Sequence, residues 1–134
     1  MEAKEGKVIN KPNNIIPIPT KLDGDFFRWW VEILKPLHGL TEREIDIITA
    51  FLKKRHELSK DILDPIKLDK YLMNDETKRE IREECGISLA HFQVIMAKFR
   101  KSNVLIDGKI NPKFIPNIKE GDSTFQLLFF FQLT

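Results

Sequence analysis

Basic side chains between positions 88 and 113 are the residues of this chain whose types and spacing most clearly suggest a chemical role. The stretch has a single carboxylate, at position 107, and its cations are Lys98, Arg100, Lys101, Lys109 and Lys113. The whole chain carries a net charge of only +2, so the excess of positive charge is local. Clustered ammonium and guanidinium groups can neutralise the phosphates of a nucleic acid. The competing interpretation is a solvated helix face, because lysine and arginine are mostly exposed in any globular protein.

Patterns for catalysis or metal binding are weak by comparison. Cys85 and His91 lie close in sequence, but a structural zinc site takes about four such ligands, and the chain has two further histidines and no other cysteine. A nucleophilic Cys85 would need an oriented base and an oxyanion pocket, which no pattern predicts, so we expect this thiol in the core. Glu83 and Glu84 fit a solvated helix better than an acid/base pair, and no glycine-rich phosphate loop is present. We therefore expect no enzyme activity, no cofactor, no metal and no small-molecule substrate.

Length and composition predict one domain with an extended arm. The chain has 134 residues, of which 42% are hydrophobic and 31% charged, as in ordinary globular proteins. Pro12, Pro17 and Pro19 disfavour helix, so we expect an extended arm over 1–22 and a folded domain over 23–134. The single cysteine excludes an internal disulfide and is typical of a reducing compartment. No apolar run approaches the roughly 20 residues of a membrane helix, so we expect a soluble cytoplasmic protein.

Three helices are predicted in the first half of the domain. The first begins near Asp23 or Asp25 and bends or ends at Pro36, with Trp29 and Trp30 in the core rather than on a base-stacking platform. The second has a capping box and a hydrophobic staple, formed by Leu40, Thr41, Glu44 and Ile45. The third is short: Asp64 caps it and Pro65 takes its first position. Its inward face consists of Leu68, Tyr71 and Leu72.

Residues 75–101 predict two further helices joined by a tight turn. Asp75 can cap the first of them, and Gly86 can end it in the left-handed conformation. Ile87 fills the turn, and Ser88 caps the second helix. Apolar residues recur at helical spacing in that helix, at Leu89, Phe92, Ile95, Met96 and Phe99. This arrangement is a helix-turn-helix.

Extended structure is predicted after Lys101. Asp107-Gly108 lies between short apolar runs, which is a strong signal for a two-residue hairpin. A further extended piece is predicted around Phe114, and the run 124–133 is predicted to be a strand with apolar residues on both sides. One interpretation makes this strand central in the hairpin sheet and covers it with the arm. The other buries it against another protein or a second subunit, which predicts a homo-oligomer or an assembly partner.

The segment from Glu83 to Pro112 resembles the core of winged helix-turn-helix proteins, on the Gly86-Ile87-Ser88 turn and the Asp107-Gly108 hairpin. The resemblance covers roughly residues 41–118, and the ending Asp-Gly-Lys-Ile-Asn-Pro-Lys-Phe is also similar to winged-helix replication initiators of plasmids and phages. The chain departs from the family at 82–84, where a small residue usually packs on the next helix. The resemblance implies a mainly helical fold with a small β wing, to which this chain adds an N-terminal helix and a C-terminal apolar strand.

The same resemblance implies that the helix after Ser88 enters the major groove of double-stranded DNA while the hairpin contacts the backbone. Gln93 is the best candidate for reading a base, because glutamine can pair bidentately with adenine. The predicted DNA contacts are Lys78, Arg79, Ser88, His91, Gln93, Lys98, Arg100, Lys101 and Lys109. Winged helices also dock on proteins, so the fold alone does not decide the function.

The string from Phe26-Phe27-Arg28-Trp29-Trp30 to Thr41-Glu42-Arg43-Glu44 is similar to small proteins of crAss-like bacteriophages. This resemblance implies a phage-encoded protein located in the cytoplasm of the infected bacterial host or in the virion. We expect it to bind DNA in transcription control, replication initiation or DNA packaging. The alternative is a structural or adaptor protein of the virion, near the portal or neck, that uses the winged helix and the last strand for assembly.

Overall fold

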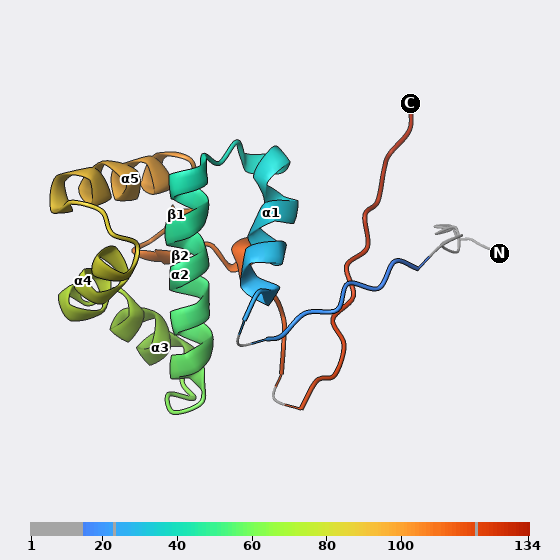
Figure 1. Cartoon of the computed structure of the whole chain (residues 1–134), viewed down its shortest axis with the longest axis horizontal. Helices are drawn as coiled ribbons and strands as arrows, with labels where there is room; N and C mark the ends of the chain where they lie inside the picture. The colour runs from blue at the N-terminus through green and yellow to red at the C-terminus, as the bar shows by residue number, and fades with distance from the viewer. Residues whose placement is uncertain (1–14, 23, 120) are drawn as a thin grey trace.

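The computed structural model describes residues 15–22, 24–119 and 121–134, and most of the predicted arm, 1–14, lies outside these ranges. The described residues are mainly helical, with one small antiparallel sheet (Figure 1). The helices are α1 (Phe26–His38), α2 (Glu42–Ser59), α3 (Pro65–Leu72), α4 (Asp75–Glu84) and α5 (Leu89–Lys101). They are followed by β1 (Leu105–Ile106), β2 (Lys109–Ile110) and the 3-10 turn η1 (Pro112–Phe114).

Helix α2 lies at the centre, with α1 on one side and α3, α4 and α5 on the other (Figure 1). Its start confirms the predicted capping box: the Thr41 hydroxyl accepts the Glu44 N–H at 3.3 Å, and the Glu44 carboxylate accepts the Thr41 N–H at 3.1 Å. Leu40 and Ile45, the predicted staple pair, are both buried. The core on α2 continues through Ile47, Ile48, Phe51 and Leu52.

Helix α1 runs through Pro36 and ends at Gly39, whose φ of 61° is a left-handed conformation that glycine adopts without strain. Trp30 is buried and donates its indole N–H to the Phe114 carbonyl at 2.7 Å. Trp29 is 47% exposed, so the expectation that both tryptophans lie in the core is wrong for this residue. Neighbouring helix positions point about 100° apart, and the core covers only one stripe of α1.

The next two helices follow their predicted signals with two corrections. Asp64 caps α3 by accepting the Ile66 N–H, and Pro65 takes the first position as expected. Tyr71 was expected to face inward, but it is 51% exposed because Leu68 and Leu72 fill the buried stripe. The cap of α4 is Asn74, one residue before the predicted Asp75: its side-chain oxygen accepts the Thr77 N–H at 2.7 Å.

The two helices α4 and α5 are joined by the short turn 85–88, in which Gly86 has a φ of 66°. Ile87 is buried in the turn, and the Ser88 hydroxyl accepts the His91 N–H at 3.1 Å, as predicted for the cap of α5. The expected inward residues are confirmed for Phe92, Ile95, Met96 and Phe99. Leu89 is 54% exposed and not part of the core, because the buried stripe of α5 begins only at Phe92.

The predicted hairpin is present at Asp107-Gly108, where both residues have positive φ values of 54° and 74°. Such a pair is typical of the two-residue turn whose twist matches antiparallel strands. The register pairs Leu105 with Ile110 and Ile106 with Lys109. The extended piece expected around Phe114 is instead the 3-10 turn η1, which Pro112 begins.

The predicted strand over 124–133 is absent from the described structure, and the sheet there consists of β1 and β2. Residues 123–134 are irregular, and none of them forms a backbone hydrogen bond with β1 or β2. The expectation of a central strand is therefore wrong. Pro112 and Pro116 explain the difference, because proline cannot donate a ladder hydrogen bond and the turn at η1 leads the chain away from the sheet.

Candidate nucleic-acid interface

The outer face of α5 is exposed along the length of the helix. Its inner side is fixed by four buried residues, so the opposite side must face solvent. Besides Leu89, the exposed residues of α5 are Ala90, His91, Gln93, Val94, Ala97, Lys98, Arg100 and Lys101. Three of them, Ala90, Val94 and Ala97, follow one another at spacings of four and three and form a stripe of small side chains. Small side chains permit the backbone of the helix to approach a partner closely.

Gln93 and the two cations at the end of α5 border this stripe. Gln93 is exposed, and no described residue hydrogen-bonds its amide group. Arg100 and Lys101 are exposed as well, and no carboxylate of the described residues lies within 4.0 Å of either. These side chains are therefore available to an external partner.

Ser88 and His91 lie at the other end of α5. Both are exposed, and the hydrogen bond between the His91 N–H and the Ser88 hydroxyl forms the cap of the helix. The Ser88 O–H and the His91 ring remain at the helix N-terminus, where the backbone dipole favours an anion. The structure thus brings Ser88, His91, Gln93, Arg100 and Lys101 together on one helix.

Lys98 has a partner within the protein. Its ammonium group pairs with the carboxylate of Glu44, a residue only 5% exposed at the start of α2. Burial raises the pKa of Glu44, but the hydrogen bonds from Lys98 and from the Thr41 backbone outweigh burial and hold that pKa below its ordinary value of 4.5. Lys98 therefore ties α5 to α2 and positions the exposed face.

Two arginines hold the turn between α4 and α5. The Arg43 guanidinium donates to the Cys85 carbonyl at 3.2 Å, and Arg82 donates to the Ile87 carbonyl at 3.5 Å. Cys85 itself is half-buried against the core, where burial and the nearby charges of Glu84 and Asp46 raise the pKa of its thiol. A thiol with a raised pKa is a poor nucleophile, in agreement with a packing role.

The predicted contacts on α4 already take part in ion pairs of their own helix. Arg79 bridges Glu76 and Glu83, and its hydrogen bonds to these two carboxylates raise its pKa. The Lys78 ammonium nitrogen lies 3.8 Å from a carboxylate oxygen of Asp75. Their charge is balanced locally, so they add little to the positive field around α5.

The base of the hairpin is held by Asn111, which the sequence analysis did not single out. Its backbone N–H donates to the Val104 carbonyl at 2.9 Å, and its side-chain amide donates to the Asn103 carbonyl at 2.9 Å. Its side-chain oxygen accepts the Lys113 N–H at 3.1 Å. The Asn-Pro dipeptide at 111–112 was the available signal, since it favours the start of a turn.

The hairpin and the turn after it each contribute one cation, Lys109 in β2 and Lys113 in η1. Lys109 is half-buried in β2 and borders an open hollow that also contains the Arg55–Asp69 ion pair. Lys113, in η1, is exposed. Neither lysine has a carboxylate of the described chain within 4.0 Å. The hollow beside Lys109 is also lined by Pro65 and Asp69, so the positive charge of this lysine lies toward α3.

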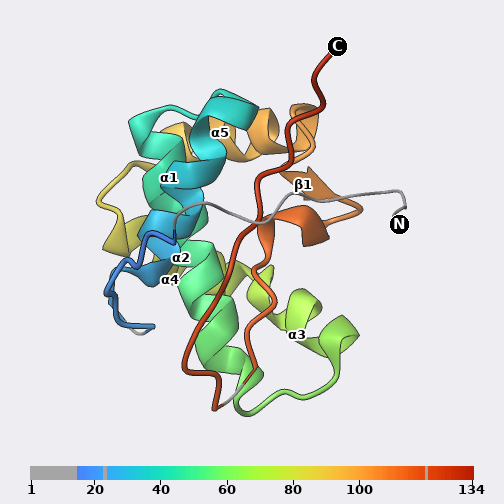
Figure 2. The same ribbon diagram turned by 90° about the vertical axis from the view of Figure 1, so that its right-hand side faces the viewer.

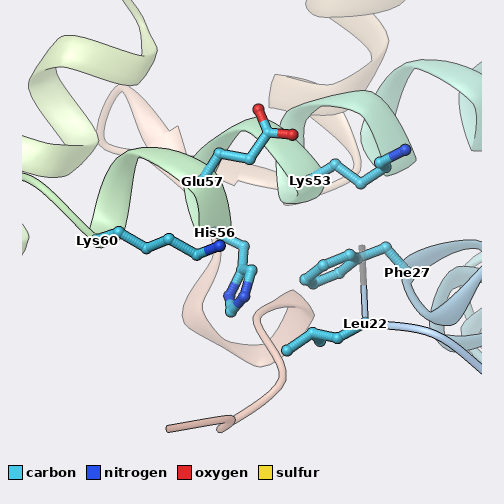
Figure 3. A pocket seen from close by; sticks show the side chains of 6 residues that line it. All are labelled: Leu22, Phe27, Lys53, His56, Glu57 and Lys60. Atoms are coloured by element: carbon cyan, nitrogen blue, oxygen red, sulfur yellow. The ribbon is translucent and has the colours of Figure 1, made fainter. Parts of the chain in front are cut away.

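The open hollow that Lys109 borders measures about 420 Å³. A second rival site is a smaller hollow of about 260 Å³ beside α2 (Figure 3). The rings of Phe27 and His56 approach each other there above Leu22, with ring centroids 5.5 Å apart, while the Glu57 carboxylate points away. Burial, with a smaller effect of the Lys60 charge, lowers the pKa of His56. This smaller hollow lies below the usual size of a ligand pocket, about 300–1,000 Å³, and none of its lining residues is a serine, threonine or cysteine that His56 could activate.

Within the described ranges, no three histidine, cysteine, aspartate or glutamate side chains gather as metal ligands. No helix in these ranges combines the length and apolarity needed to cross a membrane. Comparisons of the chain with protein-family models, with curated proteins and with solved structures found no match.

Proposed function

We propose that this chain is a winged-helix protein that binds double-stranded DNA, with α5 in the major groove and the β1–β2 hairpin on the backbone. The observation that carries the proposal is the outer face of α5. It combines a stripe of small side chains with Gln93 beside it and two cations, Arg100 and Lys101, at its end. We propose a binding role and no catalytic one.

The shape of this face fits a DNA groove. An α-helix with its side chains is about 10–12 Å across, and the major groove is about 12 Å wide. Ala90, Val94 and Ala97 leave room for the helix to sink toward the bases, and such apolar groups contact the methyl group of thymine. The amide group of Gln93 has a donor and an acceptor side by side, which is the pairing that adenine requires.

Phosphate contacts come from the two ends of α5 and from the hairpin. Arg100, Lys101, Lys109 and Lys113 supply positive charge, and Ser88 with His91 supplies hydrogen-bond donors at the start of the helix. We do not include Lys98, Lys78 and Arg79 in this set, because their charges face carboxylates of the protein. Ser88, His91, Arg100 and Lys101 thus lie at the two ends of α5, while Lys109 and Lys113 lie in β2 and η1.

Transcription control, replication initiation and DNA packaging in a phage-infected cell are the processes in which we propose that such binding acts. Each of them uses small DNA-binding domains, and the geometry of α5 suits all of them equally. The site that the protein prefers on DNA separates them.

Binding to duplex DNA tests the proposal directly. The full chain is titrated onto a labelled duplex at several salt concentrations, and the double variant Arg100→Ala with Lys101→Ala is compared with the wild type. We expect the variant to bind more weakly and the slope of log K against log salt to fall by about 2, one for each lost phosphate contact.

The matched control is Lys67→Ala with Lys70→Ala, which removes the same charge from exposed positions of α3. This helix lies below α5 in Figure 1. We expect nearly wild-type affinity from the control. An equal loss in both double variants would show that binding depends only on net charge and would refute the proposed interface. The absence of duplex binding at low salt would refute it as well.

A second candidate function is assembly in a virion, with the fold as a docking block. The exposed apolar segment after Phe125 favours it, since side chains such as Phe131, 77% exposed, are rarely left in water. Mass spectrometry of purified virions tests this role. Presence in virions together with no affinity for duplex DNA would replace the first proposal by the second.

A further inference from the structure

The C-terminal residues 124–134 form a palindrome of polar and apolar types. They read Thr-Phe-Gln-Leu-Leu-Phe-Phe-Phe-Gln-Leu-Thr. When this segment is reversed about Phe129, Thr124 lies opposite Thr134 and Gln126 lies opposite Gln132. All the remaining positions place a leucine or phenylalanine opposite a leucine or phenylalanine, and Phe129 lies opposite itself. The segment carries no charge that would oppose contact with its own copy.

The structure leaves this segment open for pairing. Its first phenylalanine, Phe125, packs edge-on against Phe26 and Trp30, with ring centroids 5.4 and 5.5 Å away. Beyond this anchor the exposed fraction at alternate positions rises from 41% at Leu127 to 90% at Leu133. Figure 2 shows the end of the chain extending past the helices. No backbone hydrogen bond joins residues 123–134 to another described residue.

We propose that two copies of this chain pair through residues 124–134 as an antiparallel ribbon whose two-fold axis passes through Phe129. Antiparallel pairing of identical strands is isologous, so each contact between two positions occurs twice. The palindrome satisfies this condition at every position, whereas a strand of an unrelated protein would have no reason to match it. A second copy is therefore the partner that the segment fits.

The faces of the ribbon agree with this register. Residues opposite each other in an antiparallel pair point to the same face, and residues alternate between faces along each strand. One face of the ribbon is entirely apolar and consists of Phe125, Leu127, Phe129, Phe131 and Leu133 from each copy. On the other face, Leu128 and Phe130 are central, and the glutamines lie toward both ends, where their amides can bond across the strands.

The anchor at Phe125 connects the ribbon to the folded domain. An isolated two-stranded ribbon is marginally stable in water, so contact with a folded body is needed to hold it. In each copy, the edge-on contacts of Phe125 with α1 provide this body. The pairing does not depend on α5 and is independent of the proposed DNA binding.

Disulfide trapping in the full chain tests the register. Directly opposed residues of an antiparallel pair have Cα atoms about 4.5–5.5 Å apart, which is within the range of a disulfide. In a Cys85→Ser background, we expect Phe129→Cys to form a covalent dimer on mild oxidation. Leu127→Cys and Phe131→Cys are expected to cross-link when the two variants are mixed and not when either is oxidised alone. Equal cross-linking of Leu128→Cys with itself would overturn the register, because position 128 lies opposite position 130.

Charge at the axis gives a second test that needs no cysteine. Phe129→Lys places two like charges directly opposite each other, and we expect it to abolish the dimer in sedimentation equilibrium. The control Thr134→Lys adds the same charge at the end of the segment, opposite Thr124, and is expected to retain the dimer. A wild-type chain that sediments as a monomer over a roughly hundredfold concentration range, or that forms large polymers, would overturn the pairing.

Discussion

The ammonium group of Lys98 on α5 forms an ion pair with the buried carboxylate of Glu44, the residue that also completes the capping box of α2. One carboxylate therefore stabilises the start of the central helix and ties α5 to it. The four buried residues of α5 decide which side of that helix faces solvent. The ion pair adds a polar contact between the two helices.

Removal of this ion pair is expected to destabilise the fold. Because Lys98 is more than half exposed, we expect Lys98→Met to lower the free energy of unfolding by about 1–2 kcal/mol, less than for a fully buried pair. Urea denaturation of Lys98→Met, Glu44→Gln and the double variant measures the coupling. The control Lys101→Met removes a cation without a described carboxylate and should leave stability within about 0.5 kcal/mol of the wild type. Additive losses in the double variant would show that the pair contributes nothing as a pair.

The same carboxylate predicts how stability depends on pH. The pKa of Glu44 in the folded state lies below the ordinary value of 4.5. At pH values between this folded pKa and 4.5, the folded state therefore binds fewer protons than the unfolded state. This contribution to stability is fully present above pH 4.5 and is lost as the pH falls through the folded pKa. Urea denaturation at a series of acidic pH values should give a shallower loss for Glu44→Gln than for the wild type. Parallel curves for the two proteins would contradict this assignment.

His56 predicts a second pH effect at higher pH. Burial and the Lys60 charge lower its pKa below 6.5, so the folded state favours the neutral ring. The stability that this preference represents is present above pH 6.5 and decreases as the pH falls through the folded value. The variant His56→Gln, which cannot titrate, should lose less stability than the wild type between about pH 7 and pH 5 in thermal melts. An unchanged difference in melting temperature across that range would exclude His56 as the titrating group.

Local signals along the chain were sufficient to predict most of the helices. The capping box at Thr41, Pro65 at the start of α3 and Ser88 before α5 depend on neighbouring residues, and each is confirmed. The hairpin was predictable for the same reason, because Asp107-Gly108 favours positive φ at both positions. Errors of one position, such as Asp75 for Asn74 at the cap of α4, arise where two neighbours can serve equally well.

Properties that depend on distant contacts were not predictable. Which of two adjacent tryptophans is buried depends on where α2 lies against α1, and the helical pattern of α1 alone left both possible. The pairing of Lys98 with Glu44 joins residues that lie far apart in sequence, and Lys98 looked like any other exposed cation. The C-terminal run has the composition of a strand, but a strand needs the edge of a sheet to pair with. The prolines after β2 lead the chain away from the sheet of β1 and β2.

Asn111 is expected to hold the hairpin in place for DNA contact. The variant Asn111→Ala loses both side-chain hydrogen bonds, to the Asn103 carbonyl and from the Lys113 N–H. We expect a loss of about 1–2 kcal/mol in stability and faster amide hydrogen exchange in β1 and β2, with α1 and α2 unaffected. Exposed Asn117, which makes no side-chain hydrogen bond to a described residue, provides the control Asn117→Ala. Unchanged exchange in the hairpin of Asn111→Ala would show that its strands hold their position without this residue.

Gln93 provides the prediction that separates base reading from charge neutralisation. Its amide is exposed beside the small-residue stripe, so truncation to alanine should leave the fold intact. We expect Gln93→Ala to lose about 1–3 kcal/mol of affinity for the preferred duplex and to keep its affinity for unrelated duplexes. Arg100→Ala should weaken binding to all duplexes alike and reduce the salt slope by about 1, because a phosphate contact carries no sequence information. Competition binding against a panel of duplexes distinguishes the two patterns, and a uniform loss in Gln93→Ala would assign this residue to the backbone instead of the bases.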